Sequence, residues 1–346
     1  MHRRDTRVLR PGHGLPVKTI AREAAEAILA GELVAFPTET VYGLGANVFD
    51  RRAVNMLFRV KGRPTDNPLI VHIADVGGAE LVAQRIPPYF ETLAERFWPG
   101  PLTLVIPRNA MVDDAVTAGL PTVAVRVPAH ELARAFLGAA GVPVAAPSAN
   151  VAGGPSPTTA EHVLADLGGR IALVIDGGPC RIGIESTVLD LTRRTPTILR
   201  PGGVAAQDIE DTIGVHVAVA SGAARRPASP GMKYRHYAPT TPVVLLVPRG
   251  SGADMMRRLQ RLIRNGRTAG MRVGLLGARE FADLGADAFH PLGSGTPVEY
   301  AREMYNGLRA LDTAGLDMII VPGLPSVGLG AAVMNRLRKA AARIVR

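Results

Sequence analysis

Short apolar segments recur along the chain, and they constrain its fold more than any other feature of the sequence. Each is a few residues long and is bounded by turn residues or by a helical pattern, which is typical of buried strands. Helical patterns separate only some of these segments, so the sequence predicts a mixed, twisted sheet and not a simple doubly wound one. The predicted strands in the first two thirds of the chain are Leu33–Phe36, Leu69–Ile73, Leu102–Ile106, Thr122–Val127, Val142–Ala146, Ala172–Ile175, Thr187–Leu191 and Thr197–Leu199.

Some stretches between these strands have the spacing of helices. The predicted helices are Lys18–Ala30, a helix from an Asp50 N-cap to about Phe58, and a helix to Leu167 that is opened by Thr158 and Glu161, which have capping-box spacing.

The pattern changes around residues 223–241, which are rich in Pro, lack periodicity and carry positive charges without negative ones. Such a segment is typical of a linker or a lid. Strands and helices alternate again after it, which predicts a small α/β domain with a parallel sheet. The predicted boundaries are a domain over 1–224, a linker over 225–241 and a second domain over 242–346. The second domain's elements are strands Val243–Val247, Arg272–Leu276 and Met318–Val321, helices Asp254–Arg264 and Val298–Leu311, and a terminal helix.

Composition excludes several classes of protein. Of the 346 residues, 47% are hydrophobic and 20% are charged, which argues against a mainly disordered chain. Cys180 is the one cysteine, so neither an intramolecular disulfide nor a Cys-based zinc site is predicted. The long uncharged run 136–160 is interrupted by several prolines and glycines, so no lipid-spanning helix is predicted. We therefore expect a soluble, cytoplasmic protein.

The common nucleotide and hydrolase signatures are absent from the sequence. No Walker-type phosphate loop, His-Glu-x-x-His or Gly-x-Ser-x-Gly motif occurs. Gly43-Leu-Gly45 and Gly328-Leu-Gly330 begin like a dinucleotide fingerprint, but Val48 and Val333 stand where its third glycine belongs.

Lys61-Gly-Arg63-Pro-Thr-Asp-Asn67 combines one of only four lysines with an arginine just before a strand. A lysine point charge and an arginine fork suit a polyphosphate ligand, although a solvated charged turn is the alternative. His72 lies within the strand that follows and is either a ligand-binding or a core histidine. The segment 37–47 precedes a helix, and we expect it to be a loop at the carboxyl edge of the sheet, where Thr40 offers a hydroxyl. The alternative is an ordinary polar turn.

Arg126 interrupts a β-branched strand, and a buried charge there requires a partner. A carboxylate ligand or a structural Asp or Glu would serve. Ser148, Ser186 and Arg200 stand at the ends of other predicted strands. Together these residues describe a pocket for an anion with no evident nucleophile, which favours catalysis by positioning and charge stabilisation.

These segments, in this order, resemble the YrdC-type threonylcarbamoyl-adenylate synthases in their two-domain form. The resemblance implies a YrdC-like domain with a twisted mixed sheet, a Pro-rich linker and a smaller C-terminal Rossmann-like α/β domain. The matching segments are Pro-Thr-Glu-Thr-Val-Tyr-Gly-Leu (37–44), Lys-Gly-Arg-Pro (61–64), Asn-Pro-Leu (67–69), Pro-Ser-Ala-Asn (147–150), Glu-Ser-Thr-Val (185–188), Arg-Pro-Gly (200–202), Ser229–Pro239 and Gly328–Leu337.

The reaction implied by this resemblance joins L-threonine, bicarbonate or CO2, and ATP into L-threonylcarbamoyl-AMP and pyrophosphate. The product serves threonylcarbamoyladenosine formation beside the anticodon of tRNAs that read ANN codons. Mg²⁺ would be bound mainly through the ATP phosphates, and no metal site made of protein ligands is expected. Hand-over of the product to a tRNA threonylcarbamoyl transferase, and weak binding of RNA or tRNA, are left open.

The resemblance also implies roles for individual residues. Lys61 and Arg63 are the expected catalytic residues, which neutralise phosphate charge. Tyr237 would close over the nucleotide as part of a lid that excludes water. The expected ATP contacts are Lys61, Arg63, Asn67, Thr122, Ser148, Asn150, Ser156, Arg200 and Tyr237. The expected L-threonine contacts are Thr40, His72, Arg126, Ala146 and Ser186, with Arg126 paired to the substrate carboxylate.

Two other functions compete with this one: an RNA-binding module, and a different ATP-dependent carbamoyl or acyl transferase. The net charge of +10 favours RNA only weakly, because aromatic residues for base stacking make up 4% of the chain. Most of the excess also lies outside the expected catalytic domain, since residues 242–346 hold 15 basic and 8 acidic residues. Pyrophosphate release that depends on threonine and bicarbonate would separate the three functions.

Overall fold

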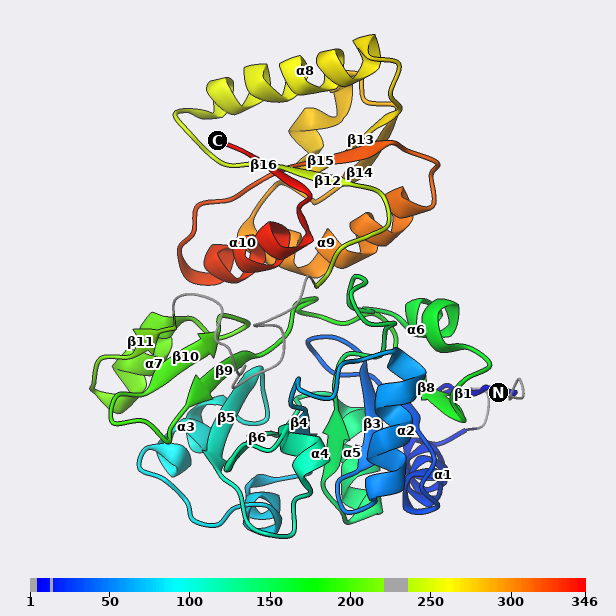
Figure 1. Cartoon of the computed structure of the whole chain (residues 1–346), viewed down its shortest axis with the longest axis vertical. Coiled ribbons are helices and arrows are strands. Elements are labelled where there is room, and N and C mark those ends of the chain that lie inside the picture. The colour runs from blue at the N-terminus through cyan, green and yellow to red at the C-terminus, as the bar shows by residue number, and fades with distance from the viewer. Residues whose placement is uncertain (1–4, 13–14, 221–235) are drawn as a thin grey trace. The chain divides into compact units, whose positions relative to one another are not determined.

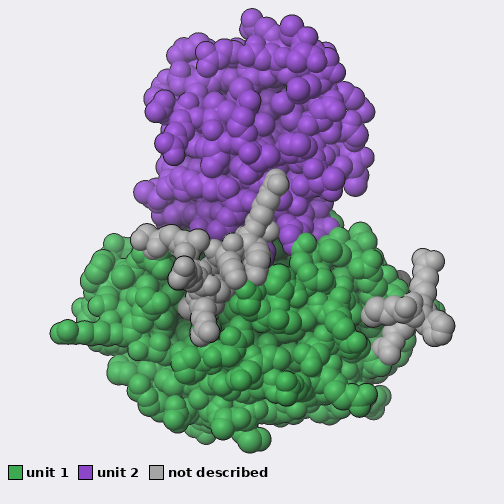
Figure 2. All heavy atoms as spheres, viewed as in Figure 1, with its two compact units in different colours: residues 1–152, 156–181, 185–234 green, residues 153–155, 182–184, 235–346 purple. Residues whose placement is uncertain are grey.

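The computed structural model describes residues 5–12, 15–220 and 236–346, which form two compact units (Figures 1 and 2). The first unit contains residues 1–152, 156–181 and 185–234, and the second contains 153–155, 182–184 and 235–346. Residues 225–235 of the predicted linker lie outside the described residues. The second unit thus includes two short segments that come from the middle of the first in sequence.

The first unit is built on an 11-stranded sheet in the order β1-β8-β2-β3-β7-β4-β6-β5-β9-β10-β11. Parallel and antiparallel pairs both occur in it, so the predicted mixed sheet is confirmed. Its strands are β1 (Arg7–Leu9), β2 (Val34–Phe36), β3 (Gly43–Asn47), β4 (Ile70–His72), β5 (Leu102–Pro107), β6 (Thr122–Arg126), β7 (Val144–Ala146), β8 (Leu173–Ile175), β9 (Thr187–Asp190), β10 (Thr197–Arg200) and β11 (Ala218–Val219). Its helices are α1 (Val17–Leu29), α2 (Arg51–Lys61), the 3-10 helix η1 (Val76–Leu81), α3 (Phe90–Phe97), α4 (Asp114–Thr117), α5 (Glu131–Ala140), α6 (Ala160–Leu167) and α7 (Ala206–Ile213).

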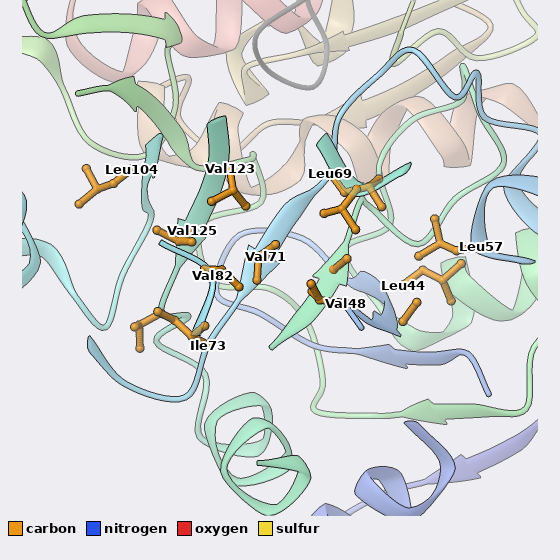
Figure 3. Packing of buried hydrophobic residues seen from close by; sticks show 14 of the residues in the cluster. Leu44, Val48, Leu57, Leu69, Val71, Ile73, Val82, Leu104, Val123 and Val125 are labelled. Atoms are coloured by element: carbon orange, nitrogen blue, oxygen red, sulfur yellow. The ribbon is translucent and has the colours of Figure 1, made fainter. Parts of the chain in front are cut away.

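The two faces of this sheet are covered differently. One face carries the main core, in which Leu57 of α2 joins strand residues such as Val71 and Val125 (Figure 3). On the other face, α1 and α5 cover β2, β7 and β8 through residues such as Ile20, Phe136 and Val144. Over β4, β6, β5, β9 and β10 this second face holds only a small cluster of strand residues: Ile70, Val105, Ala124, Val188 and Leu199.

Two local predictions were wrong. Residues 43–47, expected to be part of a loop, form β3, which pairs antiparallel with β2 and β7. Two glycines weaken the strand signal there, but the packing requires them: a Cβ on Gly45 would lie 2.8 Å from Val144 Cγ1. Helix α6 begins one residue later than expected, because the Thr159 side chain, and not that of Thr158, accepts the hydrogen bond from the His162 N–H.

The Asp50 prediction is confirmed, because its carboxylate caps α2 by accepting hydrogen bonds from the N–H groups of Arg52 and Ala53. At the other end, Gly62 ends the helix in the left-handed conformation, with φ 63°. The helix therefore ends at Lys61, directly before the basic segment.

The second unit is a five-stranded sheet in the order β14-β13-β15-β12-β16, with every pair parallel. Helix α8 lies on one side of it, and α9 and α10 lie on the other (Figure 1). This arrangement confirms the predicted Rossmann-like domain. Its elements are β12 (Val243–Leu246), α8 (Gly252–Thr268), β13 (Val273–Gly277), the 3-10 helix η2 (Arg279–Leu284), β14 (Ala288–Pro291), α9 (Pro297–Asp312), β15 (Met318–Pro322), α10 (Gly328–Ala340) and β16 (Arg343–Val345).

Within the described ranges, none of the helices combines the length and apolar character that crossing a membrane requires.

Candidate active site

The predicted ligand-binding residues of the central strands share one face of the large sheet. Directly paired residues on neighbouring strands point to the same face, and so do residues two apart on one strand. Arg126 of β6 pairs with His72 of β4, and Ile70 of β4 pairs with Ala146 of β7. Thr122 is four residues before Arg126 on the same strand. These four predicted residues therefore lie on the face that bears the small apolar cluster of strand residues.

The same face continues across β5, β9 and β10. Thr103 of β5 pairs with Val188 of β9, and Val188 pairs with Arg200 of β10. Ser186 precedes Val188 by two residues, and its hydroxyl lies 2.7 Å from that of Thr103. Arg200 donates hydrogen bonds to the Ser186 carbonyl and hydroxyl oxygens, at 3.1 Å each from Nη2. The predicted contacts Ser186 and Arg200 are thus directly bonded to each other.

Arg126 has a protein carboxylate as its partner. Its Nη2 lies 2.6 Å from Glu39 Oε1, and both side chains are almost fully buried. Nη1 donates to the Thr40 hydroxyl at 2.9 Å, and Nε donates to the Gly100 carbonyl at 3.0 Å. The sequence left open whether Arg126 pairs with a ligand carboxylate or with a structural Asp or Glu. Within the chain, its partner is a structural Glu, Glu39. These three bonds use three of the five guanidinium N–H groups, which leaves two without a partner in the described structure.

Glu39 was not singled out from the sequence, although a signal for it existed. A buried arginine at a strand end needs a nearby acid, and Glu39 is the one acidic residue in the segment 37–47 that we expected at the sheet edge. Its second oxygen accepts a hydrogen bond from the Ala129 N–H at 3.0 Å, so the carboxylate is held from two sides.

His72 is a neutral hydrogen-bonding group in this site. Burial, together with the nearby Arg126 charge, lowers its pKa to about 3. The edge of its ring contacts Phe36, with ring centroids 5.6 Å apart. Its Nδ1 is buried and has no hydrogen-bond partner among the described residues. An unpaired polar atom in a core is costly, so this nitrogen is a candidate ligand contact.

Lys61 lies at the end of α2, and its ammonium group is buried. It donates hydrogen bonds to the backbone carbonyls of Ser148 and Asn150. The Ser148 hydroxyl in turn lies 2.6 Å from Asn150 Oδ1. Lys61 therefore holds the segment after β7 in place, a task that the sequence did not indicate, and brings its positive charge to that segment.

Arg63 and Asn67 form a second local arrangement. The Arg63 guanidinium donates to the carbonyl oxygens of Asn67 and Pro68, at 3.2 and 3.0 Å from Nη2. The Asn67 side chain is 1% exposed, and neither its oxygen nor its nitrogen has a partner in the described part of the chain. A buried, unsatisfied carboxamide costs stability unless a ligand supplies the missing hydrogen bonds. Asn67 is therefore the clearest candidate ligand contact outside the sheet face.

Ser156 is buried and donates a hydrogen bond to Glu185 at 2.6 Å. The remaining predicted residue, Tyr237, belongs to the second unit, where its buried ring lies against Tyr305 and the Arg336 guanidinium. The predicted closure of Tyr237 over a nucleotide stays a prediction.

Carboxylate, thiol and imidazole groups that could bind a metal ion are not clustered. Among the described residues, no group of three or more His, Cys, Asp or Glu side chains is placed to hold one. Two buried carboxylates are bonded directly to predicted contacts: Glu39 to Arg126, and Glu185 to Ser156.

Comparison with known proteins identifies the family. Residues 26–202 match the family model described as "Telomere recombination", which covers the Sua5, YciO and YrdC proteins. Residues 204–342 match the model described as "Threonylcarbamoyl-AMP synthase, C-terminal domain". The chain belongs to the threonylcarbamoyl-AMP synthase family of enzymes. The resemblance seen in the sequence motifs is thereby confirmed.

Relatives match this enzyme over almost its whole length. It is 49% identical to the threonylcarbamoyl-AMP synthase of Pyrococcus abyssi over 92% of this chain and 93% of the relative. The corresponding Bacillus subtilis protein is 48% identical over 94% of each chain. The crystal structure of P. abyssi Sua5 complexed with L-threonine matches with a TM-score of 0.92 and 46% identity, over 99% of this chain and 100% of that one.

Proposed function

We propose that this enzyme makes L-threonylcarbamoyl-AMP and pyrophosphate from L-threonine, bicarbonate or CO2, and ATP. The observation that carries the proposal is the convergence of two arginines and several uncharged hydrogen-bonding groups on one sheet face. Arg126 and Arg200 supply positive charge there, while His72 and Ser186 supply neutral contacts. Such a face suits a ligand that has a carboxylate and a phosphate as well as small polar groups.

The L-threonine site is proposed at the His72 and Arg126 end of this face. The two remaining N–H groups of Arg126 can receive the substrate carboxylate, while Glu39 keeps the guanidinium oriented. A neutral His72 can accept or donate a hydrogen bond without adding charge. Thr40, Ala146 and Ser186 complete the proposed set. A relative of this chain has been crystallised with L-threonine, which supports an amino-acid ligand.

The ATP site is proposed beside it, at the basic segment and the strand ends. Asn67 offers a donor and an acceptor that lack partners, which suits a nucleotide. Lys61 and Arg63 would offset phosphate charge. The other proposed contacts are Thr122, Ser148, Asn150, Ser156, Arg200 and Tyr237. Mg²⁺ would arrive on the ATP phosphates and neutralise part of their charge.

The proposed chemistry proceeds in two balanced steps. The threonine amine nitrogen attacks the carbon of CO2 and loses a proton, which gives a carbamate. A carbamate oxygen then attacks the α-phosphorus of ATP, and the bond to pyrophosphate breaks as the new P–O bond forms. Arg126 would anchor threonine while Lys61 and Arg63 stabilise the phosphate charge, so catalysis rests on positioning and electrostatics.

The same proposal has three further parts. The product is used to modify tRNAs that read ANN codons, it is handed over to a tRNA threonylcarbamoyl transferase, and the enzyme is located in the cytoplasm. Direct binding of tRNA is a separate hypothesis, for which the charge of residues 242–346 is weak support.

A panel experiment tests the proposal. The protein is incubated with ATP, labelled bicarbonate and each amino acid in turn, and labelled acyl-AMP is separated and counted. We expect label in the product with L-threonine alone among the amino acids. Preference for another amine would indicate a related transferase, and the absence of any labelled adenylate would refute the proposed synthesis.

A further inference from the structure

Thr103, near the start of β5, is a residue to which neither the sequence nor the proposed reaction assigns a task. Its exposed fraction is 0%. Its side chain lies on the face of the sheet that bears the proposed ligand contacts, because Thr103 pairs with Val188, two residues after Ser186. Continuing the β5–β6 register by one residue places it opposite Arg126. Since β5 lies between β6 and β9, Thr103 stands between two proposed L-threonine contacts, Arg126 and Ser186.

The Thr103 side chain makes one hydrogen bond within the described part of the chain. Its hydroxyl oxygen lies 2.7 Å from that of Ser186, and either group can be the donor. Among the described residues, the Ser186 hydroxyl has one other partner, Nη2 of Arg200, which donates to it at 3.1 Å. Ser186 is itself 0% exposed. The two hydroxyls are therefore a buried pair that receives one further donor, from Arg200.

A count of hydrogens and lone pairs shows what this pair lacks. Two hydroxyl groups carry two hydrogens and four lone pairs. The bond between them uses one hydrogen and one lone pair, and the bond from Arg200 uses a second lone pair. One hydrogen remains, whichever hydroxyl donates to the other. A buried donor without an acceptor costs free energy, so this hydrogen requires an acceptor that a ligand would supply.

The proposed reaction supplies such an acceptor in the L-threonine carboxylate, whose proposed anchor is Arg126. A carboxylate is a stronger acceptor than a hydroxyl group. With the ligand bound, Ser186 therefore donates to the carboxylate, and Thr103 donates to Ser186. Both lone pairs of the Ser186 hydroxyl are then occupied, by Thr103 and Arg200, so that this hydroxyl can act only as a donor.

The backbone of Ser186 is held separately from its hydroxyl. Nε and Nη2 of Arg200 donate to the Ser186 carbonyl oxygen, at 3.2 and 3.1 Å. A Cβ added to Gly202 would lie 2.2 Å from the carbonyl carbon of Ser186, so the two backbones are in direct contact. These contacts leave open the direction of the hydroxyl hydrogen, and the Thr103 hydroxyl is placed to set it.

We infer that Thr103 is a positioning residue for L-threonine and that it acts through Ser186. Its hydroxyl donates to Ser186 and thereby directs the Ser186 hydrogen to the substrate carboxylate. This inference deepens the proposed function and rests on it, since it takes Ser186 and Arg126 as L-threonine contacts.

The inference predicts a loss of L-threonine affinity that depends on Ser186. Thr103→Val removes the hydroxyl and keeps the shape of the side chain, so the Kd for L-threonine should rise about fivefold, as expected for one neutral hydrogen bond. Thr103→Ser retains the hydroxyl and should keep nearly the wild-type Kd. In the Ser186→Ala background, Thr103→Val should cause no further rise, because the residue through which it acts is gone.

Thr197→Val is the matched control. Thr197 is another buried strand threonine of the first unit, with an exposed fraction of 6%, but its hydroxyl donates to the Thr195 carbonyl at 2.9 Å. Its removal should leave the Kd for L-threonine unchanged. Thr103→Ala also lacks the hydroxyl and takes the place of Thr103→Val if thermal melting shows that the valine variant does not fold.

The test measures the Kd for L-threonine by calorimetry on the full chain. A rise of about fivefold that Thr103→Ser does not share, and that disappears in the Ser186→Ala background, supports the inference. An unchanged Kd in the variants without the hydroxyl, or a rise of the same size with and without Ser186, overturns it. A wild-type chain that does not bind L-threonine would refute the proposed function instead, whereas failure of the inference alone leaves wild-type binding intact.

Discussion

The buried pair of Arg126 and Glu39 offers the most quantitative test of how the site is built. Arg126→Met would leave the Glu39 carboxylate buried with one remaining partner, the Ala129 N–H. Removal of one member of a buried ion pair typically costs about 3–5 kcal/mol of folding free energy, because the other charge is left uncompensated. We therefore expect Arg126→Met and Glu39→Gln each to be strongly destabilised.

The double variant separates the pair energy from the other losses. When both charges are removed, no uncompensated ion remains, so the double variant should be more stable than the sum of the single losses predicts. The expected coupling energy is about 2–3 kcal/mol, the upper part of the range for residues in direct contact. The bonds of Arg126 to Gly100 and Thr40 are lost in either background and cancel from the cycle.

The assay is urea unfolding followed by the fluorescence of Trp98, the one tryptophan of the chain. Trp98 lies in the first unit, where its indole N–H donates to the Leu102 carbonyl at 2.7 Å, so its signal reports on the unit that contains the pair. A coupling energy below about 0.5 kcal/mol, which is the additive behaviour of distant sites, would show that Arg126 and Glu39 do not stabilise each other as a buried ion pair.

Three further predictions follow from individual residues. Asn67→Ala should raise the Kd for ATP at least about tenfold, and calorimetry measures this change. The melting temperature of the unliganded protein should not fall, because the variant removes a buried carboxamide that has no partners among the described residues. A large fall in melting temperature would contradict that expectation. Because the pKa of His72 is about 3 in the folded protein and near 6.5 in the unfolded chain, the unfolded chain binds more protons between those values. Stability should therefore fall on acidification through this window, by about 1.4 kcal/mol per pH unit from this residue, and His72→Gln should flatten the dependence in urea titrations. Gly45→Ala should lower the free energy of unfolding by about 1–3 kcal/mol, because its methyl group would collide with Val144. Gly138→Ala, which has open space around the added methyl group, should not lower it. Equal unfolding midpoints for the two variants would contradict this difference in packing.

Most of the strands were predictable from the sequence, but in the first unit only α1, α2 and α6 were predicted, and α3, α4, α5 and α7 were not. The predicted strands that became β4, β5 and β6 consist mostly of β-branched and other apolar residues, and Asp50 caps α2 as its position indicated. The strand β3 was missed because local propensity opposes it. Its Gly43 and Gly45 have no side chains to signal a strand, and their small size matters only once Phe36 and Val144 pack against them.

The sequence indicated which residues belong to the candidate site, but it did not indicate how their side chains are bonded to one another. Thr122 and Arg126 share a face because they are four residues apart on one strand, a relation that the sequence contains. The pairing of Arg126 with Glu39 joins residues 87 positions apart, and no local pattern encodes such a contact. The bonds of Lys61 to the carbonyls of Ser148 and Asn150 are likewise tertiary, since backbone acceptors leave no trace in the sequence.

In the proposed reaction, the α-phosphorus of ATP becomes bonded to a carbamate made from threonine. The most direct measurement uses ATP labelled at the α-phosphate, with L-threonine and bicarbonate, and follows the label by chromatography. We expect the label to enter an adenylate while unlabelled pyrophosphate is released, and we expect omission of either threonine or bicarbonate to prevent both. Label recovered in ADP would contradict it, because that result means attack at the γ-phosphorus.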